Sequence, residues 1–295
     1  MHLCMTRRLS ICAYLHKYDE IMFLQSRNWR RPVIYNMTTP IHFFHANGFP
    51  SETYKDLLSN IEGDIHSPIS ILGKNISSVE EGYSDFVDEV IEHASVTQGE
   101  GIAIGHSFGA TLSLLAEAKH PGLFKTIILL DPPLFSRTKM VIISFLRKLG
   151  LEYLFTPAKK SMKRRETFSS SEEAEDYFAS KVLFREIPRS TIKLYVNHGL
   201  EEVDGELRLT IPREREVDIF LNFPTKLPKQ VSDIKGNLIY ADKIRLLDDA
   251  DLKWWDKAMP KMTKTPFQGS HMFPFEKPEE LAWEINGILG RAELN

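Results

Sequence analysis

Short apolar runs alternate with amphipathic segments along most of the chain. The apolar runs predict buried strands at 41–44, 69–72, 101–104, 125–130, 237–240 and 264–267. Apolar residues recur at helical spacing over 51–61, 78–93, 108–120, 249–259 and 278–289. Ser51 is expected to cap the first of these helices, and Ser78 with Glu81 matches a capping box for the second. Strands alternating with helices predict an α/β fold with a mostly parallel sheet flanked by helices.

This alternation stops between residues 134 and 232, where the chain reads as mostly helical and charged. It resumes at residue 233. We therefore expect a core formed by 37–133 and 233–295, interrupted by a mostly helical cap insertion at 134–232, a size within the usual range for a domain.

The first 36 residues differ in charge from the rest of the chain. They carry six basic and two acidic residues, a local charge of +4 in a chain whose net charge is −3. Two interpretations remain open. Either residues 9–15 and 20–25 are strands joined by a turn, or residues 1–36 are a loosely attached extension and the folded unit begins near Met37. The apolar stretch at 9–15 is too short to span a membrane, and no cleavage site with small residues follows it, so we expect no secretory signal peptide.

Composition narrows the class of protein further. The chain has 295 residues, of which 42% are hydrophobic and 26% charged, as is typical of globular domains. Its pI of about 6.4 argues against a general nucleic-acid binder. No run of 18 apolar residues predicts a transmembrane helix. The only cysteines are Cys4 and Cys12, which excludes a disulfide framework and favours a reduced, cytoplasmic protein.

The segment Gly105–Gly109 reads GHSFG and matches the motif G-x-S-x-G. A predicted strand precedes it and a predicted helix follows, which is the strand–turn–helix setting of a nucleophilic serine. The small residues at 105 and 109 allow strand and helix to pass closely while Ser107 occupies a tight turn. Ser107 is therefore the candidate nucleophile.

A serine hydroxyl needs a base, and His271 is the candidate. It follows the last predicted strand, so it lies on a loop at the same edge of the sheet as Ser107. His106 lies inside the turn and is interpreted as a packing residue. His45 ends the first strand and is a candidate for substrate contact or structural hydrogen bonding.

An oxyanion hole requires two preorganised N–H donors. The first is expected from Phe108, the residue after the nucleophile. The second is expected from the loop after the first strand, where Phe49 is the best candidate and Gly48 leaves room for the substrate oxygen. Pro50 has no N–H and cannot serve.

Together these residues resemble the α/β-hydrolase family, in its serine-hydrolase branch with a helical cap. The resemblance covers residues 38–290 and rests on the segments HANGFP, GHSFG, LLDPP and GSHMFPFEKPEE in that order. It implies an eight-stranded, mostly parallel sheet, a Ser–His–acid triad and a cap over the site. It implies no metal and no organic cofactor. A serine at the turn argues against the family's haloalkane dehalogenases and epoxide hydrolases, which use Asp there.

The acid of the triad departs from the family's usual position. Ile244 and Arg245 occupy the places where the acid is expected, after the next-to-last strand. Asp242 lies nearby, but Arg245 is expected to compete for its carboxylate. Asp131 follows the strand after Ser107 and precedes Pro132, and we favour it slightly over Asp242.

The start of the insertion is both basic and apolar. Residues 137–165 hold nine Lys or Arg and one acid, Glu152, among many large apolar side chains. The segment is either a cap helix packed on the core with a solvated basic face, which we favour, or a lid over an acyl pocket or an interfacial helix that touches a membrane surface. We expect its apolar face to line the entrance of the site, with Phe145 and Leu146 in the substrate pocket beside His45 and Asn47.

The leading functional hypothesis is therefore a hydrolase of a small or medium carboxylic ester or related acyl compound, working through an acyl-enzyme. A non-catalytic ligand receptor or scaffold on the same fold is the alternative from a different class. Cleavage of a C–C bond or acyl transfer with the same triad is the third. The sequence does not choose among substrates or indicate an oligomeric state.

Overall fold

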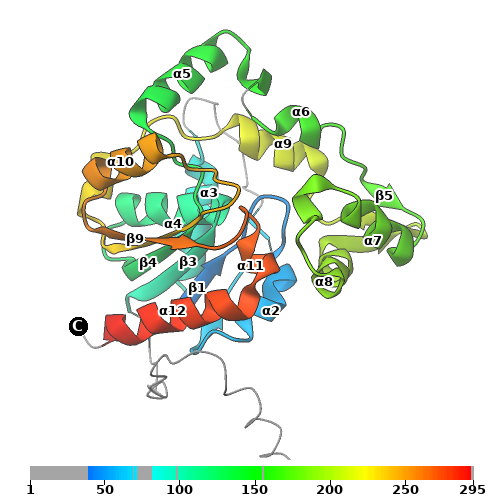
Figure 1. The fold of residues 1–295 in the computed structure, drawn as a ribbon, viewed down its shortest axis with the longest axis horizontal. Coiled ribbons are helices and arrows are strands. Elements are labelled where there is room, and N and C mark those ends of the chain that lie inside the picture. Colours follow the sequence, from blue (N-terminus) through cyan, green and yellow to red (C-terminus); the bar gives the residue numbers. More distant parts are fainter. Residues whose placement is uncertain (1–38, 69, 72–81, 98, 155, 294–295) are drawn as a thin grey trace, which may run out of the picture. The chain divides into compact units, whose positions relative to one another are not determined.

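The computed structural model describes residues 39–68, 70–71, 82–97, 99–154 and 156–293, and six parallel strands form their central sheet (Figure 1). The strands are β1 (Ile41–Phe44), β2 (Ile65–His66), β3 (Gly101–His106), β4 (Phe124–Leu130), β8 (Gly236–Ala241) and β9 (Met262–Phe267). Their order across the sheet is β2-β1-β3-β4-β8-β9. The predicted α/β class with a mostly parallel sheet is confirmed. The eight strands implied by the family resemblance are not all present, because the described residues supply six to this sheet.

Alternate strand residues face opposite layers of helices, as a pleated strand requires. Ile102 and Ile104 of β3 belong to the core on one face, together with α2 (Lys55–Leu58) and α12 (Pro278–Glu293). Ala103 belongs to the core on the other face, which contains α3 (Ser84–Ala94), α4 (Phe108–Lys119) and α10 (Asp249–Ala258) (Figure 1). Because both faces are covered, the central strands are mostly apolar: every residue of β1 and β3 and the last four of β4 are buried, whereas β9 at the edge of the sheet contains Lys264 and two threonines.

Some element boundaries differ from the sequence prediction. The segment 51–61 begins as a 3₁₀ helix, η1 (Ser51–Tyr54), with Pro50 rather than Ser51 at the N-cap. Helix α3 begins only at Ser84, after Gly82 with its φ of +55°. The predicted capping box at 78–81 lies outside the described residues, as do both alternatives for residues 1–36. Of the strand expected at 69–72, residues 70–71 are described and are not in a strand.

The stretch between β4 and β8 carries its own elements. Its helices are α5 (Arg137–Lys148), η2 (Glu152–Leu154), α6 (Ala158–Ser161), α7 (Ser171–Ala179), η3 (Val182–Phe184), α8 (Arg189–Gly199), α9 (Arg213–Leu221) and η4 (Lys229–Asp233). A small antiparallel sheet, in the order β5-β7-β6, joins β5 (Thr167–Phe168), β7 (Glu206–Leu209) and β6 (Leu200–Val203). This sheet was not predicted, because strands of two to four residues are too short to show a period of two. Among the described helices, none is both long and apolar enough to cross a lipid bilayer.

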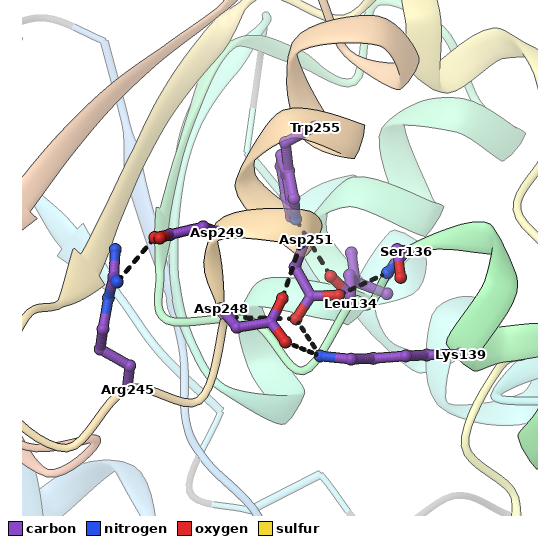
Figure 2. Close-up of polar contacts among 8 residues, drawn as sticks. All are labelled: Leu134, Ser136, Lys139, Arg245, Asp248, Asp249, Asp251 and Trp255. Carbon is purple, nitrogen blue, oxygen red and sulfur yellow. Dashed lines mark hydrogen bonds and ion pairs between the residues drawn. The ribbon is translucent and has the colours of Figure 1, made fainter.

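A buried aspartate fastens the beginning of α5 to α10 (Figure 2). One carboxylate oxygen of Asp251 accepts the N–H of Ser136, and the other accepts from Lys139 Nζ, at 2.8 and 2.7 Å. Trp255, one turn further along α10, donates its indole N–H to the carbonyl oxygen of Leu134 at 3.0 Å. Because Asp251 is fully buried, each of its bonds lies in a low-dielectric setting where it is strengthened. The first turn of α5 is therefore held firmly against the core.

A buried histidine organises the turn at the end of β1. The Nδ1–H of His45 donates to the carbonyl oxygen of Ala46 at 2.8 Å, and Nε2 accepts the N–H of Ile71 at 2.7 Å. Both hydrogen bonds form together only when the ring is neutral, because one nitrogen then donates and the other accepts. Burial lowers the pKa of His45 from 6.5 to about 4, and the bond to Ala46 opposes this shift only in part. This neutral ring holds the turn that adjoins Ser107.

Close packing of α4 against β1 generates a stability prediction. A Cβ atom on Gly109 would lie 2.1 Å from the Phe44 carbonyl oxygen, so Gly109→Ala forces the helix and strand apart. We expect the free energy of unfolding in urea to fall by about 2 kcal/mol or more. The matched control is Gly287→Ala in α12, where the nearest atom is 3.7 Å from the new Cβ. That variant should gain up to about 1 kcal/mol, since Ala favours a helix over Gly. Equal effects of the two substitutions would contradict the packing argument.

The buried His45 predicts a loss of stability in acid. Its pKa is about 4 in the folded chain and near 6.5 when unfolded, so between these values the unfolded chain binds a proton that the native chain excludes. Stability is therefore complete above pH 6.5 and falls as the pH drops towards 4. His45→Gln keeps a donor and an acceptor but does not ionise. Between pH 7 and pH 5, urea unfolding should show an acid loss about 2 kcal/mol larger for the native chain than for this variant. An identical pH dependence of the two proteins would refute the assignment.

Candidate active site

Ser107 occupies the turn between β3 and α4. Its φ of 54° and ψ of −110° lie outside the regions that most residues adopt, so the backbone is strained here. The Ser107 N–H donates to the carbonyl oxygen of Leu130 at 2.8 Å, which ties the turn to the end of β4. A Cβ on Gly105 would lie 2.5 Å from the carbonyl oxygen of Gly109. The motif glycines are therefore required by the close crossing, and the serine lies at the carboxyl edge of the sheet.

A continuous chain of hydrogen bonds leads from Ser107 to a buried carboxylate. His271 Nε2 lies 2.9 Å from Ser107 Oγ, and His271 Nδ1 lies 2.6 Å from Asp131 Oδ2. A carboxylate only accepts, so Nδ1 carries the proton and Nε2 of the neutral ring accepts from the serine hydroxyl. Asp131 is fully buried, whereas the side chain of His271 is 28% exposed. The three residues span 164 positions of the sequence and meet because β3, β4 and β9 end at the same edge of the parallel sheet, with β3 beside β4 and only β8 between β4 and β9.

Two neighbouring strands hold Asp131 in place. The residue follows β4 with a φ of 47°, a left-handed conformation that Asp tolerates better than most residues. Its N–H donates to the Ile239 carbonyl oxygen of β8 at 2.8 Å. Its Oδ1 accepts the N–H of Ala241 at 3.2 Å, which leaves Oδ2 for His271. The carboxylate is thus oriented by the backbone of β8 before it meets the imidazole.

Asp242, the other candidate acid, has a different set of contacts. It is exposed, and its Oδ1 accepts the N–H of Gly269 at 3.3 Å. It therefore holds the loop that precedes His271 and has no described contact with the imidazole. The expected competition from Arg245 for Asp242 is wrong, because Arg245 pairs with Asp249 at 2.7 Å (Figure 2).

The loop that carries His271 is rigidly held. The N–H of Ser270 donates to Glu276 Oε2 at 3.0 Å, and the Ser270 hydroxyl donates to the other carboxylate oxygen of Glu276. The N–H of Met272 donates to the Ser270 hydroxyl oxygen at 3.1 Å. Glu276 ends the short helix α11 (Phe273–Glu276), so the helix and the loop support each other.

His106 supports the His271 loop from beneath. Its Nε2 lies 2.9 Å from the carbonyl oxygen of His271, and since a carbonyl only accepts, Nε2 carries the proton. Its Nδ1 then accepts the hydroxyl of Tyr54 at 2.7 Å, and the Tyr54 oxygen accepts the N–H of Ala46 at 3.1 Å. Burial, followed by the proximity of His271, lowers the pKa of His106 well below its usual value. A neutral His106 therefore links the loop after β1 to the loop of His271, and it has no free nitrogen with which to act as a base.

The two backbone amides expected to hold an oxyanion differ in their bonding. Among the described residues, no acceptor is bonded to the N–H of Phe108, which opens α4. The N–H of Phe49 donates to the Ala46 carbonyl oxygen at 3.1 Å, so this bond has to open or be shared before Phe49 can serve. The same turn also contains the N–H groups of Asn47 and Gly48, and neither has a partner within the described part of the chain.

A buried ion pair from the insertion packs on this turn. Arg164 bonds to Glu216 and to the hydroxyl of Tyr195. The carbonyl oxygen of Glu216 accepts from the side chain of Asn47 at 3.0 Å, and the Tyr195 hydroxyl donates to the carbonyl oxygen of Gly48 at 3.2 Å. A Cβ at Gly48 would lie 3.1 Å from the Arg164 guanidinium, and the φ of +78° also requires glycine here. The insertion therefore contacts the core beside the unpaired amides of the turn.

The residues expected in a substrate pocket do not all gather at one place. Asn47 lies in the turn next to the site, and His45 is buried beneath it with both ring nitrogens bonded. Phe145 and Leu146 lie on α5, where Phe145 is 60% exposed. No described contact joins either residue to Ser107 or His271.

Sequence reasoning missed the residues that support the site from a distance. Tyr54, Arg164, Tyr195 and Glu216 lie in segments without a motif, and each acts through a partner more than 30 residues away. The sequence shows that 164–216 contains both acidic and basic residues, but composition does not reveal which of them form ion pairs. In the described residues no cluster of three His, Cys, Asp or Glu is arranged to hold a metal ion.

Comparisons with known sequences give distant relatives. No family model matches the chain. The 2-(acetamidomethylene)succinate hydrolase of Mesorhizobium japonicum is 26% identical over 177 residues, which are 56% of this chain and 56% of the relative. A probable alcohol acetyltransferase of Cyberlindnera fabianii is 21% identical over 285 residues, which are 86% of this chain and 72% of the relative. The chain thus matches little more than half the length of the first relative.

Comparison of structures extends the likeness to most of the chain. The crystal structure of E-2-(acetamidomethylene)succinate hydrolase matches with a TM-score of 0.68 and 20% identity, covering 85% of this chain and 91% of that protein. A peroxisomal α/β-hydrolase from Saccharomyces cerevisiae matches with a TM-score of 0.64 and 15% identity, covering 86% and 76%. At such identities the likeness concerns the fold. The parallel sheet, the strained turn at Ser107 and these likenesses agree that the chain has the α/β-hydrolase fold.

Proposed function

We propose that this protein is a serine hydrolase that cleaves a carboxylic ester or a related acyl compound through an acyl-enzyme intermediate. The observation that carries the proposal is the chain of bonds from Asp131 through His271 to Ser107, at 2.6 and 2.9 Å. A nucleophile, a base that touches it and an acid that orients the base are the parts that acyl transfer requires.

In the proposed first step, the Ser107 oxygen attacks the substrate carbonyl carbon while His271 Nε2 takes the hydroxyl proton. Asp131 accepts the Nδ1–H throughout and stabilises the imidazolium that forms. The imidazolium then gives the Nε2 proton to the leaving group, and the acyl group remains on Ser107. In the second step, water attacks the acyl carbon while His271 Nε2 takes a proton from it. The bond from the acyl carbon to the Ser107 oxygen then breaks, the imidazolium returns its proton to that oxygen, and the acid product leaves.

The negative oxygen of each tetrahedral intermediate needs donors that are already in place. The N–H of Phe108 is the proposed first donor, and its position at the start of the 12-residue helix α4 adds the favourable end of the helix dipole. The second donor is proposed to come from the turn 47–49, whose Asn47 and Gly48 amides have no partner among the described residues. The buried pair of Arg164 and Glu216 supports this turn from the insertion.

Acyl transfer is the second candidate, because a probable alcohol acetyltransferase aligns with 86% of this chain. The chemistry would be the same up to the acyl-enzyme, after which an alcohol instead of water takes the acyl group. Product analysis with and without added alcohol separates the two outcomes. A non-catalytic receptor is disfavoured. The unusual sequence position of the triad acid was the argument for it, and Asp131 lies within hydrogen-bonding distance of His271.

The proposed nucleophile predicts the result of covalent labelling. A fluorophosphonate probe should label the native protein and fail to label Ser107→Ala, because the probe reacts only with an activated serine. The matched control is Ser113→Ala on the same helix, whose fully buried hydroxyl donates to the Gly109 carbonyl oxygen and has no described bond to His271. It should be labelled like the native protein, as read by in-gel fluorescence. Persistent labelling of Ser107→Ala would remove the proposed nucleophile.

The role of Asp131 as the acid of the triad is tested by measuring the turnover of a chromogenic short-chain ester. Asp131→Asn should reduce kcat on the order of 10⁴-fold, because an amide in this place favours the wrong tautomer of His271. Asp242→Asn should change kcat by less than about tenfold, since Asp242 bonds only to the loop backbone. Circular dichroism checks that both variants are folded. Near-native turnover in Asp131→Asn, or a collapse confined to Asp242→Asn, would reverse the assignment.

A further inference from the structure

Helix α5 exposes a stripe of large apolar side chains. The apolar stripe consists of Val141, Ile142 and Phe145 on α5 and Leu149 directly after it, which are 49–60% exposed; Ile142, Phe145 and Leu149 follow one another at spacings of three and four residues, which places them on one helix face. Eight of the thirteen exposed large hydrophobic residues in the described chain fall between 141 and 162. The expectation that this helix packs its apolar face on the core is therefore wrong for these positions. Such a cluster is costly in water, and its size marks an interaction surface.

Exposed cations accompany the apolar stripe along the same segment of the chain. We call them the basic rim: Arg137 and Lys148 at the two ends of α5, Lys159 and Lys160 on α6, and Lys163 just after α6. Within the described part of the chain, no carboxylate lies close enough to any of the five to form an ion pair. Lys139 is excluded from the rim because Asp248 and Asp251 already neutralise it (Figure 2). The segment 137–163 thus combines exposed apolar side chains with exposed cations that have no described ion-pair partner.

The helix is held at both ends, so its apolar face points outward for a structural reason. Ser136 and Lys139 bind Asp251 at the first turn, and Arg147 donates to the Phe223 carbonyl oxygen near the last turn, at 2.6 Å. Met140 is the buried residue that packs inward. Rotation of the helix to bury the stripe would break these bonds.

Charge decides which occupant fits this surface. Residues 1–36 carry six basic and two acidic residues, so this segment of the chain would be repelled by the basic rim. A second copy would bring a second basic rim against the first, with the same result. An anionic bilayer instead supplies phosphates for the cations and a hydrocarbon boundary for the stripe, as interfacial helices require.

We propose that the apolar stripe and the basic rim bind the surface of an anionic phospholipid membrane, with α5 lying in the plane of the interface. The 12 residues of α5 are too few to span a bilayer, so the attachment is peripheral and reversible. Because α5 begins six residues after Asp131, attachment would bring the candidate active site close to the lipid surface. The proposal concerns binding only and does not depend on the proposed reaction.

The test is co-sedimentation of the full-length protein with vesicles of phosphatidylcholine alone or with 30% phosphatidylglycerol. The native protein should bind the anionic vesicles at least tenfold more strongly than the neutral ones, and 0.5 M salt should remove most of this difference. The combined variant Ile142→Ser, Phe145→Ser and Leu149→Ser should bind at least tenfold more weakly. So should Lys159→Gln, Lys160→Gln and Lys163→Gln.

The matched control is Ile244→Ser, which removes an apolar side chain that is 68% exposed outside the insertion. It should bind vesicles like the native protein, and thermal melts should show all variants folded. Absence of native binding to anionic vesicles would overturn the proposal, as would equal binding by the native protein and both combined variants. Concentration-dependent dimers that the apolar substitutions abolish, without vesicle binding, would identify a second copy as the occupant instead.

Discussion

The close crossing of α4 over β1 and β3 is the constraint on which the rest of the site depends. Gly105 and Gly109 leave no room for a Cβ atom, and the turn between them forces Ser107 into a strained backbone conformation. The strain is tolerated because bonds from Ser107 to Leu130 and from Gly109 to His45 hold the turn on both sides. As a result, the serine hydroxyl and the first N–H groups of α4 occupy one fixed place at the edge of the sheet.

Neutral, buried histidines then connect the loops that converge on this edge. His45 supports the turn after β1, and His106 joins that turn, through Tyr54, to the backbone of His271. Burial keeps both rings uncharged, so each can donate from one nitrogen and accept at the other. His271, by contrast, is partly exposed and borders both Ser107 and Asp131. Three histidines close in space therefore have different roles because their environments differ.

The insertion has two parts with opposite character. One part places the buried pair of Arg164 and Glu216 on the turn at Gly48, where a charged pair is favourable because each partner is also bonded to neighbouring polar groups. Elsewhere in the same segment, α5 leaves large apolar side chains in solvent. The same hundred residues thus support the turn beside Ser107 and also expose the apolar stripe proposed to bind a membrane surface.

Local pattern was enough to predict the α/β class, the strand–turn–helix around Ser107 and the loop position of His271, because apolar periodicity and glycine spacing act over a few residues. The choice between Asp131 and Asp242 stayed open, since it depends on which strand lies beside β4. Only the pairing of β4 with β8 orients Asp131 towards His271, because the N–H of Ala241 in β8 holds the other oxygen of its carboxylate. Composition likewise showed that residues 137–165 are both basic and apolar, but not whether the apolar side chains are covered, because burial depends on neighbours distant in sequence.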